Sequence, residues 1–118
     1  MESKVTAPPM LENDLLNLVI DYARVYGWLV VHFRSSRTKH GWSTAVSADG
    51  AGFPDLVLVH PGRQRVVWVE LKREHGKLSN KQRNWRAWLL AAGQEWHMWQ
   101  PSDWSEIEQV LGRKEEAE

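Results

Sequence analysis

The amino-acid sequence predicts an α/β fold, in which one compact domain has a four-stranded mixed sheet flanked by helices. The chain has 118 residues, a length that suits one domain with its own core. Two stretches show the apolar spacing of helices, and four short apolar runs have the length of strands. The elements follow one another as α-β-β-β-α-β-α, and helices on both faces of such a sheet would cover its apolar surfaces.

The first part of the domain is predicted to hold one long helix and one strand. Residues 10–26 carry apolar side chains at helical spacing, and Gly27 follows them as a stop signal. Residues 28–33 form a short apolar run that predicts a buried strand. Residues 1–9 end in two prolines and are predicted to be a flexible leader, so the domain begins at residue 10.

The middle of the chain is predicted to hold a long loop followed by a hairpin. Residues 35–52 are rich in Ser, Gly, Arg and Lys and have no apolar period. Loops of this length are usually functional or mobile. Residues 55–60 and 65–72 are apolar and β-branched, and they flank Pro-Gly-Arg-Gln, which predicts two antiparallel strands joined by a tight turn.

The last part is predicted to be helix, strand, helix. Ser79 and Gln82 have the spacing of a capping box, and Gly93 ends the helix that they begin. Residues 95–99 give the fourth strand. A final helix opens at residues 101–103 and closes the domain at residue 112, leaving 113–118 as a charged tail.

Tryptophan is abundant, with eight residues, and six of them fall on apolar stripes or strands and are predicted to be core. These six are Trp28, Trp68, Trp85, Trp88, Trp96 and Trp99; of them, Trp85 and Trp88 share the apolar stripe of the second helix with Leu89 and Ala92.

Composition excludes several classes of function. The chain has no cysteine, which rules out disulfides, thiolate zinc sites and a cysteine nucleophile. Its histidines show no metal-ligand spacing. No apolar run approaches the roughly 18 residues of a membrane span, and the N-terminus has no signal-peptide core. A cytoplasmic protein with no membrane partner is therefore expected.

The charge is balanced overall, at zero net, but it is unevenly distributed. Basic residues gather between residues 24 and 40 and again between residues 72 and 86, whereas acids gather near the C-terminus. Such a basic face could bind a polyanion, or it could be an ordinary solvated surface. Trp42 lies among these cations and could stack on unpaired bases, or simply pack within the loop. The candidate contacts for such a polyanion are Arg34, Arg37, Lys39, Trp42, Arg73, Lys77 and Lys81.

The predicted hairpin brings two acids and a lysine together. If the turn is residues 61–64, Asp55 lies opposite Glu70, and directly opposed residues point to the same face of an antiparallel pair. Lys72 is two residues beyond Glu70 and shares that face. Two carboxylates this close repel unless a cation neutralises them, and hard oxygen ligands suit magnesium or manganese. The alternative is a structural patch of two acids bridged by the lysine.

Two further polar residues could join this group. Glu12 lies on the side of the first helix that faces the core and could supply a third metal-site carboxylate, or it could simply favour the helix N-terminus. Gln82 leans toward the packed face of its helix and could bind the scissile phosphate or the attacking water. Its alternative role is the reciprocal cap with Ser79.

These residues resemble a known superfamily. Gly52-Phe53-Pro54-Asp55-Leu56, followed by Glu70-Leu71-Lys72 on the next strand, resembles the PD-(D/E)xK nuclease signature. The Gly-x-Pro-Asp sequence, Leu78-Ser79, Gln82 and the helix-borne Glu12 together resemble the VRR-NUC family, the virus-type replication-repair nuclease domain. The resemblance covers residues 11–100, which is most of the chain.

The resemblance implies a restriction-endonuclease-like core that hydrolyses DNA phosphodiesters with magnesium or manganese. It implies that Asp55, Glu70 and the backbone carbonyl of Leu71 bind the metal, that Lys72 is the catalytic lysine, and that Glu12 and Gln82 complete the site. Stand-alone members of this size resemble phage or bacterial proteins and Holliday-junction resolvases. A homodimer acting on branched DNA, in a bacterial cell or a phage-infected host, is therefore expected.

Two other functions remain open from the sequence. One is a flap nuclease or a less selective DNA nuclease. The other is a nucleic-acid-binding module in which the acids are merely structural. The complete set of three acids and a lysine weighs against the binding module, because binding phosphate gains nothing from carboxylates.

Overall fold

The computed structural model describes residues 10–33, 35–38, 41–44 and 48–112. The predictions of a leader, a charged tail and DNA contacts at Arg34 and Lys39 fall outside these residues. Within them, no helix has both the length and the apolar character needed to cross a lipid bilayer.

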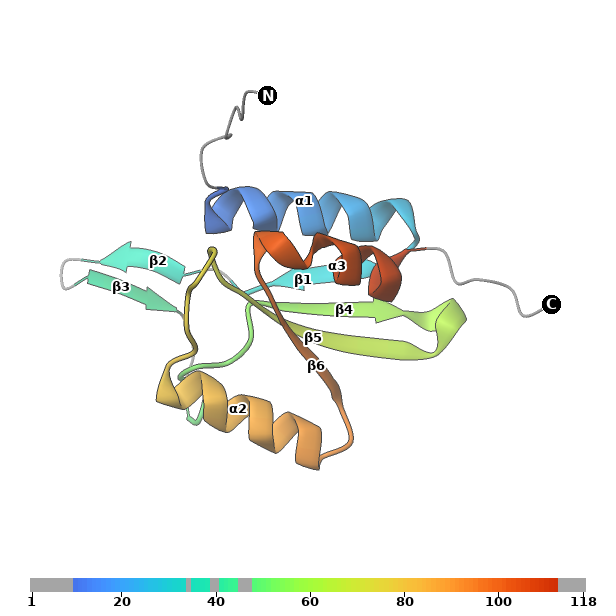
Figure 1. Cartoon of the computed structure of the whole chain (residues 1–118). Coiled ribbons are helices and arrows are strands. Elements are labelled where there is room, and N and C mark those ends of the chain that lie inside the picture. The colour runs from blue at the N-terminus through green and yellow to red at the C-terminus, as the bar shows by residue number, and fades with distance from the viewer. Residues whose placement is uncertain (1–9, 34, 39–40, 45–47, 113–118) are drawn as a thin grey trace, which may run out of the picture.

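A four-stranded mixed sheet forms the centre of the molecule, as predicted (Figure 1). Its strands lie in the order β1-β4-β5-β6, with bounds Leu29–His32, Leu56–His60, Arg65–Leu71 and Glu95–Trp99. The pairs β1–β4 and β4–β5 are antiparallel, and β6 is parallel to β5. The parallel pair needs a crossover, which the helix α2 (Asn80–Ala91) provides.

Helices cover both faces of this sheet. Helices α1 (Glu12–Val25) and α3 (Trp104–Leu111) lie on one face, and α2 lies alone on the other (Figure 1). The predicted final helix begins as a 3-10 turn, Pro101–Asp103, before α3 takes over. The α/β class and the order of helices and main-sheet strands are therefore as the sequence predicts.

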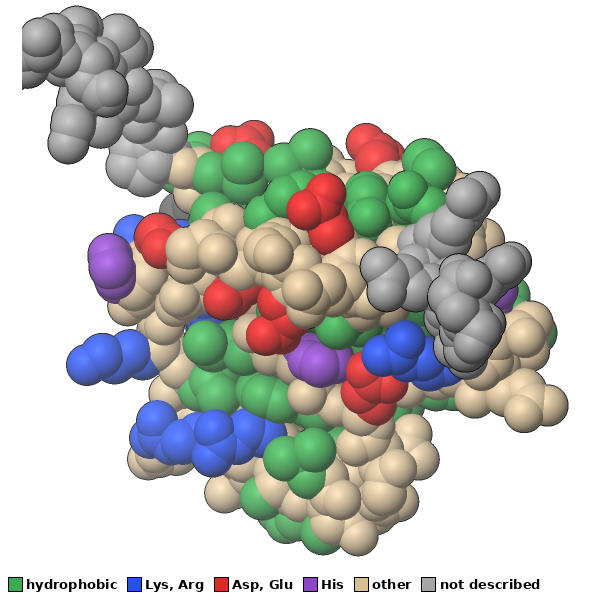
Figure 2. Space-filling model, turned by 45° about the vertical axis from the view of Figure 1, so that its right-hand side comes forward, with side chains coloured by type: hydrophobic (Ala, Val, Ile, Leu, Met, Phe, Trp, Pro, Cys, Tyr) green, Lys and Arg blue, Asp and Glu red, His purple; other side chains and the backbone are tan. Residues whose placement is uncertain are grey.

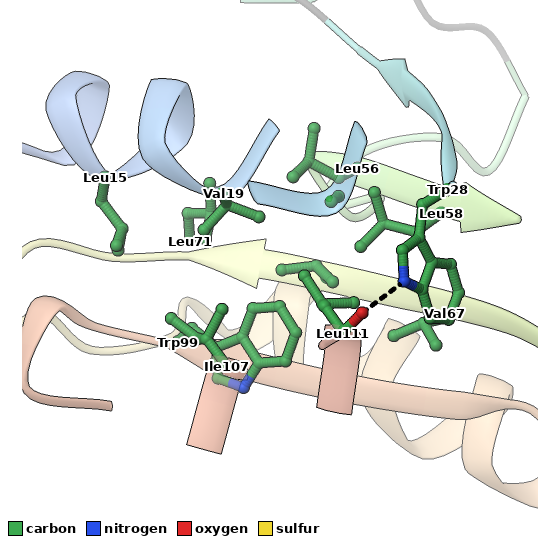
Figure 3. Close-up of a cluster of buried hydrophobic side chains, with 12 residues drawn as sticks. Leu15, Val19, Trp28, Leu56, Leu58, Val67, Leu71, Trp99, Ile107 and Leu111 are labelled. Atoms are coloured by element: carbon green, nitrogen blue, oxygen red, sulfur yellow. Dashed lines mark hydrogen bonds between the residues drawn. The ribbon is translucent and has the colours of Figure 1, made fainter. Parts of the chain in front are cut away.

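The core lies between α1, α3 and the sheet (Figure 3). Leu15, Val19 and Ala23 recur every fourth residue on α1, and all three are fully buried. Alternate residues of the two central strands meet them from the sheet, namely Leu56 and Leu58 of β4 with Val67, Val69 and Leu71 of β5. Because strand side chains alternate between faces, the residues between these point toward α2 instead.

The predicted long loop is wrong in part, because it contains a second, two-stranded sheet. Strands β2 (Ser35–Thr38) and β3 (Gly41–Thr44) pair in antiparallel fashion, with Ser35 opposite Thr44. This ribbon projects away from the main sheet (Figure 1). Its strands pair with each other, and their sequences lack the apolar alternation that identifies a buried strand.

The predicted core role of Trp88 is also wrong. Its side chain is 53% exposed, and Leu89 is the one buried residue of α2. Ala92 is exposed and Trp85 is half-buried, whereas Trp28 and Trp99 are buried as predicted. Among the residues that the structure describes, α2 is the one helix on its face of the sheet, so it has no helical neighbour there to bury a second apolar stripe.

The hairpin between β4 and β5 has the predicted register although its turn differs in detail. The turn is a 3-10 helix, Pro61–Arg63, in which His60 Nδ1 accepts a hydrogen bond from the N–H of Arg63. Gln64 follows in the left-handed region, at φ 52°. His60 still pairs with Arg65, and that pairing fixes every opposition further along the two strands.

Candidate active site

The hairpin register places Asp55 opposite Glu70. Leu56 pairs with Val69, so Asp55 lies one step beyond that pair, at the start of β4. Asp55 Oδ2 accepts a hydrogen bond of 2.8 Å from the N–H of Leu71. This bond holds the Asp55 carboxylate against β5, beside Glu70.

Glu70 is the one charged side chain that is buried in the described part of the chain, with 3% exposure. Burial, and after it the negative charge of Asp55 and a hydrogen bond to that residue, raise the pKa of Glu70 to about 10, against the opposing charge of Lys72. The protein alone therefore strongly disfavours two ionised carboxylates here. A cation between them would reverse that preference.

Lys72 and Glu12 lie close to this pair. Lys72, two residues after Glu70, lowers the pKa of both Glu70 and Glu12 by its positive charge. Glu12 is the first residue of α1; the residue is exposed as a whole, yet partial burial of its carboxyl and the charge of Asp55 raise its pKa. Glu12 therefore interacts with the acid pair as well as with its own helix end.

Gln82 forms the reciprocal cap with Ser79 that the sequence offers as one of its two roles, and it also contacts Glu70. Its side-chain Oε1 accepts a hydrogen bond of 2.8 Å from the backbone N–H of Ser79, while the backbone N–H of Gln82 donates to Ser79 Oγ at 3.2 Å. The other end of the amide, Nε2, donates to Glu70 Oε2 at 2.9 Å. One side chain thus caps α2 and ties the start of that helix to the buried acid.

The donor set fits a small, hard cation held mainly by two carboxylates. Magnesium commonly binds one or two carboxylates and completes its shell with waters and phosphate oxygens. Asp55 and Glu70 are such a pair, and the hydrogen bond from Leu71 brings that peptide beside them. Across the residues that the structure describes, no three Asp, Glu or His side chains converge tightly enough to enclose a metal ion by themselves.

That Glu12 ligates the metal directly stays a prediction. Glu70 contacts α2, so it faces the side of the sheet opposite α1. Glu12 comes from α1, and its negative charge adds to those that raise the pKa of Glu70.

Exposed basic side chains lie close to the acids in the chain. Arg73 follows Lys72 directly and lowers the pKa of Glu12, and Lys77 and Lys81 are exposed between β5 and the first turn of α2. Figure 2 shows several Lys and Arg side chains at the left of the molecule, and a further group at the right beside acidic side chains. The backbones of Arg37 and Trp42 pair directly in the β2–β3 ribbon, whereas the predicted contacts of their side chains fall outside what the structure describes.

Sequence reasoning assigned no structural role to Gly52 and Phe53. Gly52 has a φ of +81° and lies against Lys81 and Gln82. The ring of Phe53 contacts those of Phe33, Trp68 and Trp85. The available signal was a glycine and an aromatic residue immediately before Pro54-Asp55, since such a glycine often marks a close backbone approach.

Comparison with known protein families identifies the family to which the chain belongs. The family model of the VRR-NUC domain matches residues 12–97, a span that begins at Glu12, takes in β1, β4 and β5 of the main sheet and ends within β6. No curated protein and no solved structure matches the chain. The matched span contains the acids, the lysine and the glutamine described above, and the chain belongs to the VRR-NUC family of nucleases.

Proposed function

We propose that this nuclease is a magnesium- or manganese-dependent DNA endonuclease that prefers branched DNA, such as four-way junctions. The observation that carries the metal dependence is the buried Glu70 beside Asp55, where each negative charge opposes the other. We further propose that it acts in the cytoplasm of a bacterial cell or a phage-infected host, in keeping with the stand-alone nucleases that its motifs resemble.

Asp55, Glu70 and the carbonyl of Leu71 would hold the cation. When bound there, the cation supplies Lewis acidity for phosphodiester hydrolysis. Gln82 keeps the Glu70 carboxylate oriented through its hydrogen bond of 2.9 Å. Glu12 adds negative charge that helps to retain the cation near the end of the sheet.

Lys72 is the group of this chain that would act on the reacting phosphate. Its ammonium shares a strand face with Glu70 and is close enough to oppose the charge of that acid. From this position it would orient the attacking water and stabilise the charge that develops on the phosphate oxygens.

The β2–β3 ribbon and the basic residues would grip the DNA. A two-stranded ribbon is narrow enough to enter the major groove. The ribbon follows β1 directly, and the N–H of Phe33, at the end of β1, donates to the backbone carbonyl of Asp55 at 2.8 Å. The ribbon therefore starts beside the acid pair, and Arg37, Trp42 and the exposed Arg73, Lys77 and Lys81 are the proposed contacts.

A panel of DNA structures with one common sequence tests this proposal. Four-way junction, flap, splayed-arm and linear duplex DNAs are incubated with the protein and magnesium, manganese, calcium or a chelator. Cleavage with magnesium or manganese alone, fastest on the junction, is expected. Equal cleavage of all four DNAs would indicate a less selective nuclease. Salt-dependent binding without cleavage in any metal would indicate a binding module.

A further inference from the structure

Residues 48–55, which lead into β4, pack against the start of α2. Gly52 makes the closest approach: a Cβ built on it would lie 2.5 Å from the carbonyl carbon of Lys81 and 2.8 Å from the backbone nitrogen of Gln82. Real Cβ atoms essentially never approach other heavy atoms that closely. Any side chain at residue 52 would therefore push the segment and the helix apart.

Each of the two surfaces that meet at Gly52 carries a residue of the candidate active site. The segment ends in Asp55, three residues after Gly52. The helix turn carries Gln82, whose Nε2 donates to Glu70 at 2.9 Å. The separation at Gly52 therefore sets how far the start of α2, and with it Gln82, lies from the two acids.

A second contact fastens the same two surfaces further along. The indole Nε1 of Trp85 donates to the backbone carbonyl of Asp49 at 3.0 Å. The Phe53 ring packs edge-on against Trp85, at 4.9 Å between centroids, and against Trp68 of the sheet, at 5.3 Å. The segment is thus held to α2 on both sides of Gly52. It therefore cannot easily shift away from the helix to make room for a larger residue at position 52.

We propose that Gly52 is a positioning residue for catalysis. Its missing side chain lets α2 approach closely enough for Gln82 to orient the buried Glu70 against Asp55. Trp85 maintains this close approach through its contacts with Asp49 and Phe53. The inference rests on the proposed active site. It adds the contacts, at Gly52 and Trp85, that set the distance of α2 from the two acids.

Gly52→Ala and Gly93→Ala form a matched pair. The two glycines have nearly equal positive φ angles, +81° and +80°, so alanine meets the same backbone strain at both. They differ in surroundings, because nothing lies within 4 Å of a Cβ at Gly93. We expect Gly52→Ala to lower kcat on the order of 10- to 100-fold with little change in KM, because misplacement by about 1 Å is this costly. Gly93→Ala should keep the wild-type kcat.

A double-mutant cycle with Gln82→Ala tests whether Gly52 acts through Gln82. If it does, Gly52→Ala should cost little further kcat once Gln82 has been removed, because the shared interaction is already lost. A general structural defect would instead lower kcat by the same factor in both backgrounds. If Gly52→Ala lowers kcat by the same factor with and without Gln82→Ala, the proposal is overturned.

Trp85→Phe keeps the inference testable if Gly52→Ala does not fold. It preserves an aromatic ring and removes the hydrogen bond to Asp49, and it should lower kcat several-fold while the exposed control Trp88→Phe does not. Unchanged kcat in Trp85→Phe, or in a folded Gly52→Ala, would overturn the positioning role. Full cleavage by Asp55→Asn would instead contradict the proposed active site, so the two failures are distinguishable.

Discussion

Glu70 and Lys72 are two residues apart on one strand, and their opposite charges suit opposite tasks. Glu70 is buried where its own charge is disfavoured, which suits the proposed role of a metal ligand. Lys72 is half-buried beside it and carries a charge that a phosphate would attract. Each task leads to a different measurable consequence when the residue is replaced.

Glu70→Gln should remove the response of stability to magnesium. Glutamine has nearly the same shape and no charge, so the fold should persist without metal. A cation that binds only the folded state raises the unfolding temperature, and this rise should disappear in the variant. Thermal unfolding in chelator and in millimolar magnesium measures the effect. Glu108→Gln, at an exposed position of α3, is the control, and an undiminished magnesium response in Glu70→Gln would argue against the ligand role.

Lys72→Ala should lower turnover far more than DNA affinity. The ammonium is proposed to act on charge that develops only in the transition state, so about 100-fold or more should be lost from kcat. Lys77→Ala, which removes an exposed cation, should instead weaken binding in a salt-dependent manner and leave kcat at saturating DNA unchanged. If Lys72→Ala behaved as Lys77→Ala is expected to, Lys72 would be only a phosphate contact. Steady-state cleavage and binding across a salt series separate the two.

At the scale of elements, the β2–β3 ribbon is the part most clearly separable from the core. Ser35 and Thr44 lie directly opposite each other, so a short Gly/Ser linker can replace residues 36–43 without moving their neighbours. Junction affinity should fall, while the unfolding temperature and its rise with magnesium should stay as in the wild type. Gel-shift and thermal unfolding measurements check both. If junction binding and cleavage are unchanged, the ribbon does not bind the DNA, and the basic residues after Lys72 must do so instead.

Elements that bury a face were predictable from the sequence, and the ribbon was not. The four-residue spacing of Leu15, Val19 and Ala23 and the apolar runs of β4 and β5 record the faces that meet in the core. The sequence of the ribbon has no such apolar period. The periodicity of α2 predicted an amphipathic helix, but it could not show that Trp88 is left exposed.

The same distinction holds within the site. Counting back from the turn was enough to place Asp55 opposite Glu70, because a hairpin register is local. The close approach of Gly52 to α2 depends on where the crossover helix comes to rest, which is a long-range outcome of packing. Helix spacing offered Glu12 and Gln82 as candidate site residues, and the family resemblance included both. It could not show that Gln82 caps its helix and binds Glu70 at the same time.

At the scale of the whole molecule, we propose a homodimer, because two-fold related strands of a junction are matched most simply by a two-fold enzyme. On the sheet face that α2 leaves uncovered, Leu29, Val31 and Val66 are 62%, 49% and 38% exposed. The apolar residues Ile107 and Leu111 of α3 are fully buried, so α3 offers less apolar surface. The uncovered sheet face is thus the better candidate for contact between subunits.

Light scattering at micromolar concentration should give twice the chain mass of 13.7 kDa. Leu29→Lys should shift the protein toward monomer, since it places a charge in the contact. Val25→Lys, at the last residue of α1 and 76% exposed, should not. A monomeric wild type that still makes paired, symmetric cuts in a junction would rule out the dimer as the source of that symmetry.

Cleavage of a four-way junction by Asp55→Asn protein tests the metal site most directly. Asparagine retains an oxygen that can accept the hydrogen bond from Leu71, so the fold should be preserved while one of the two metal-binding charges is lost. With magnesium, cleavage should fall to background, whereas junction affinity in chelator should stay the same or rise because one charge that repels phosphate is gone. Cleavage by Asp55→Asn at the wild-type rate would contradict the assignment of Asp55 and Glu70 as the metal-binding pair of this nuclease.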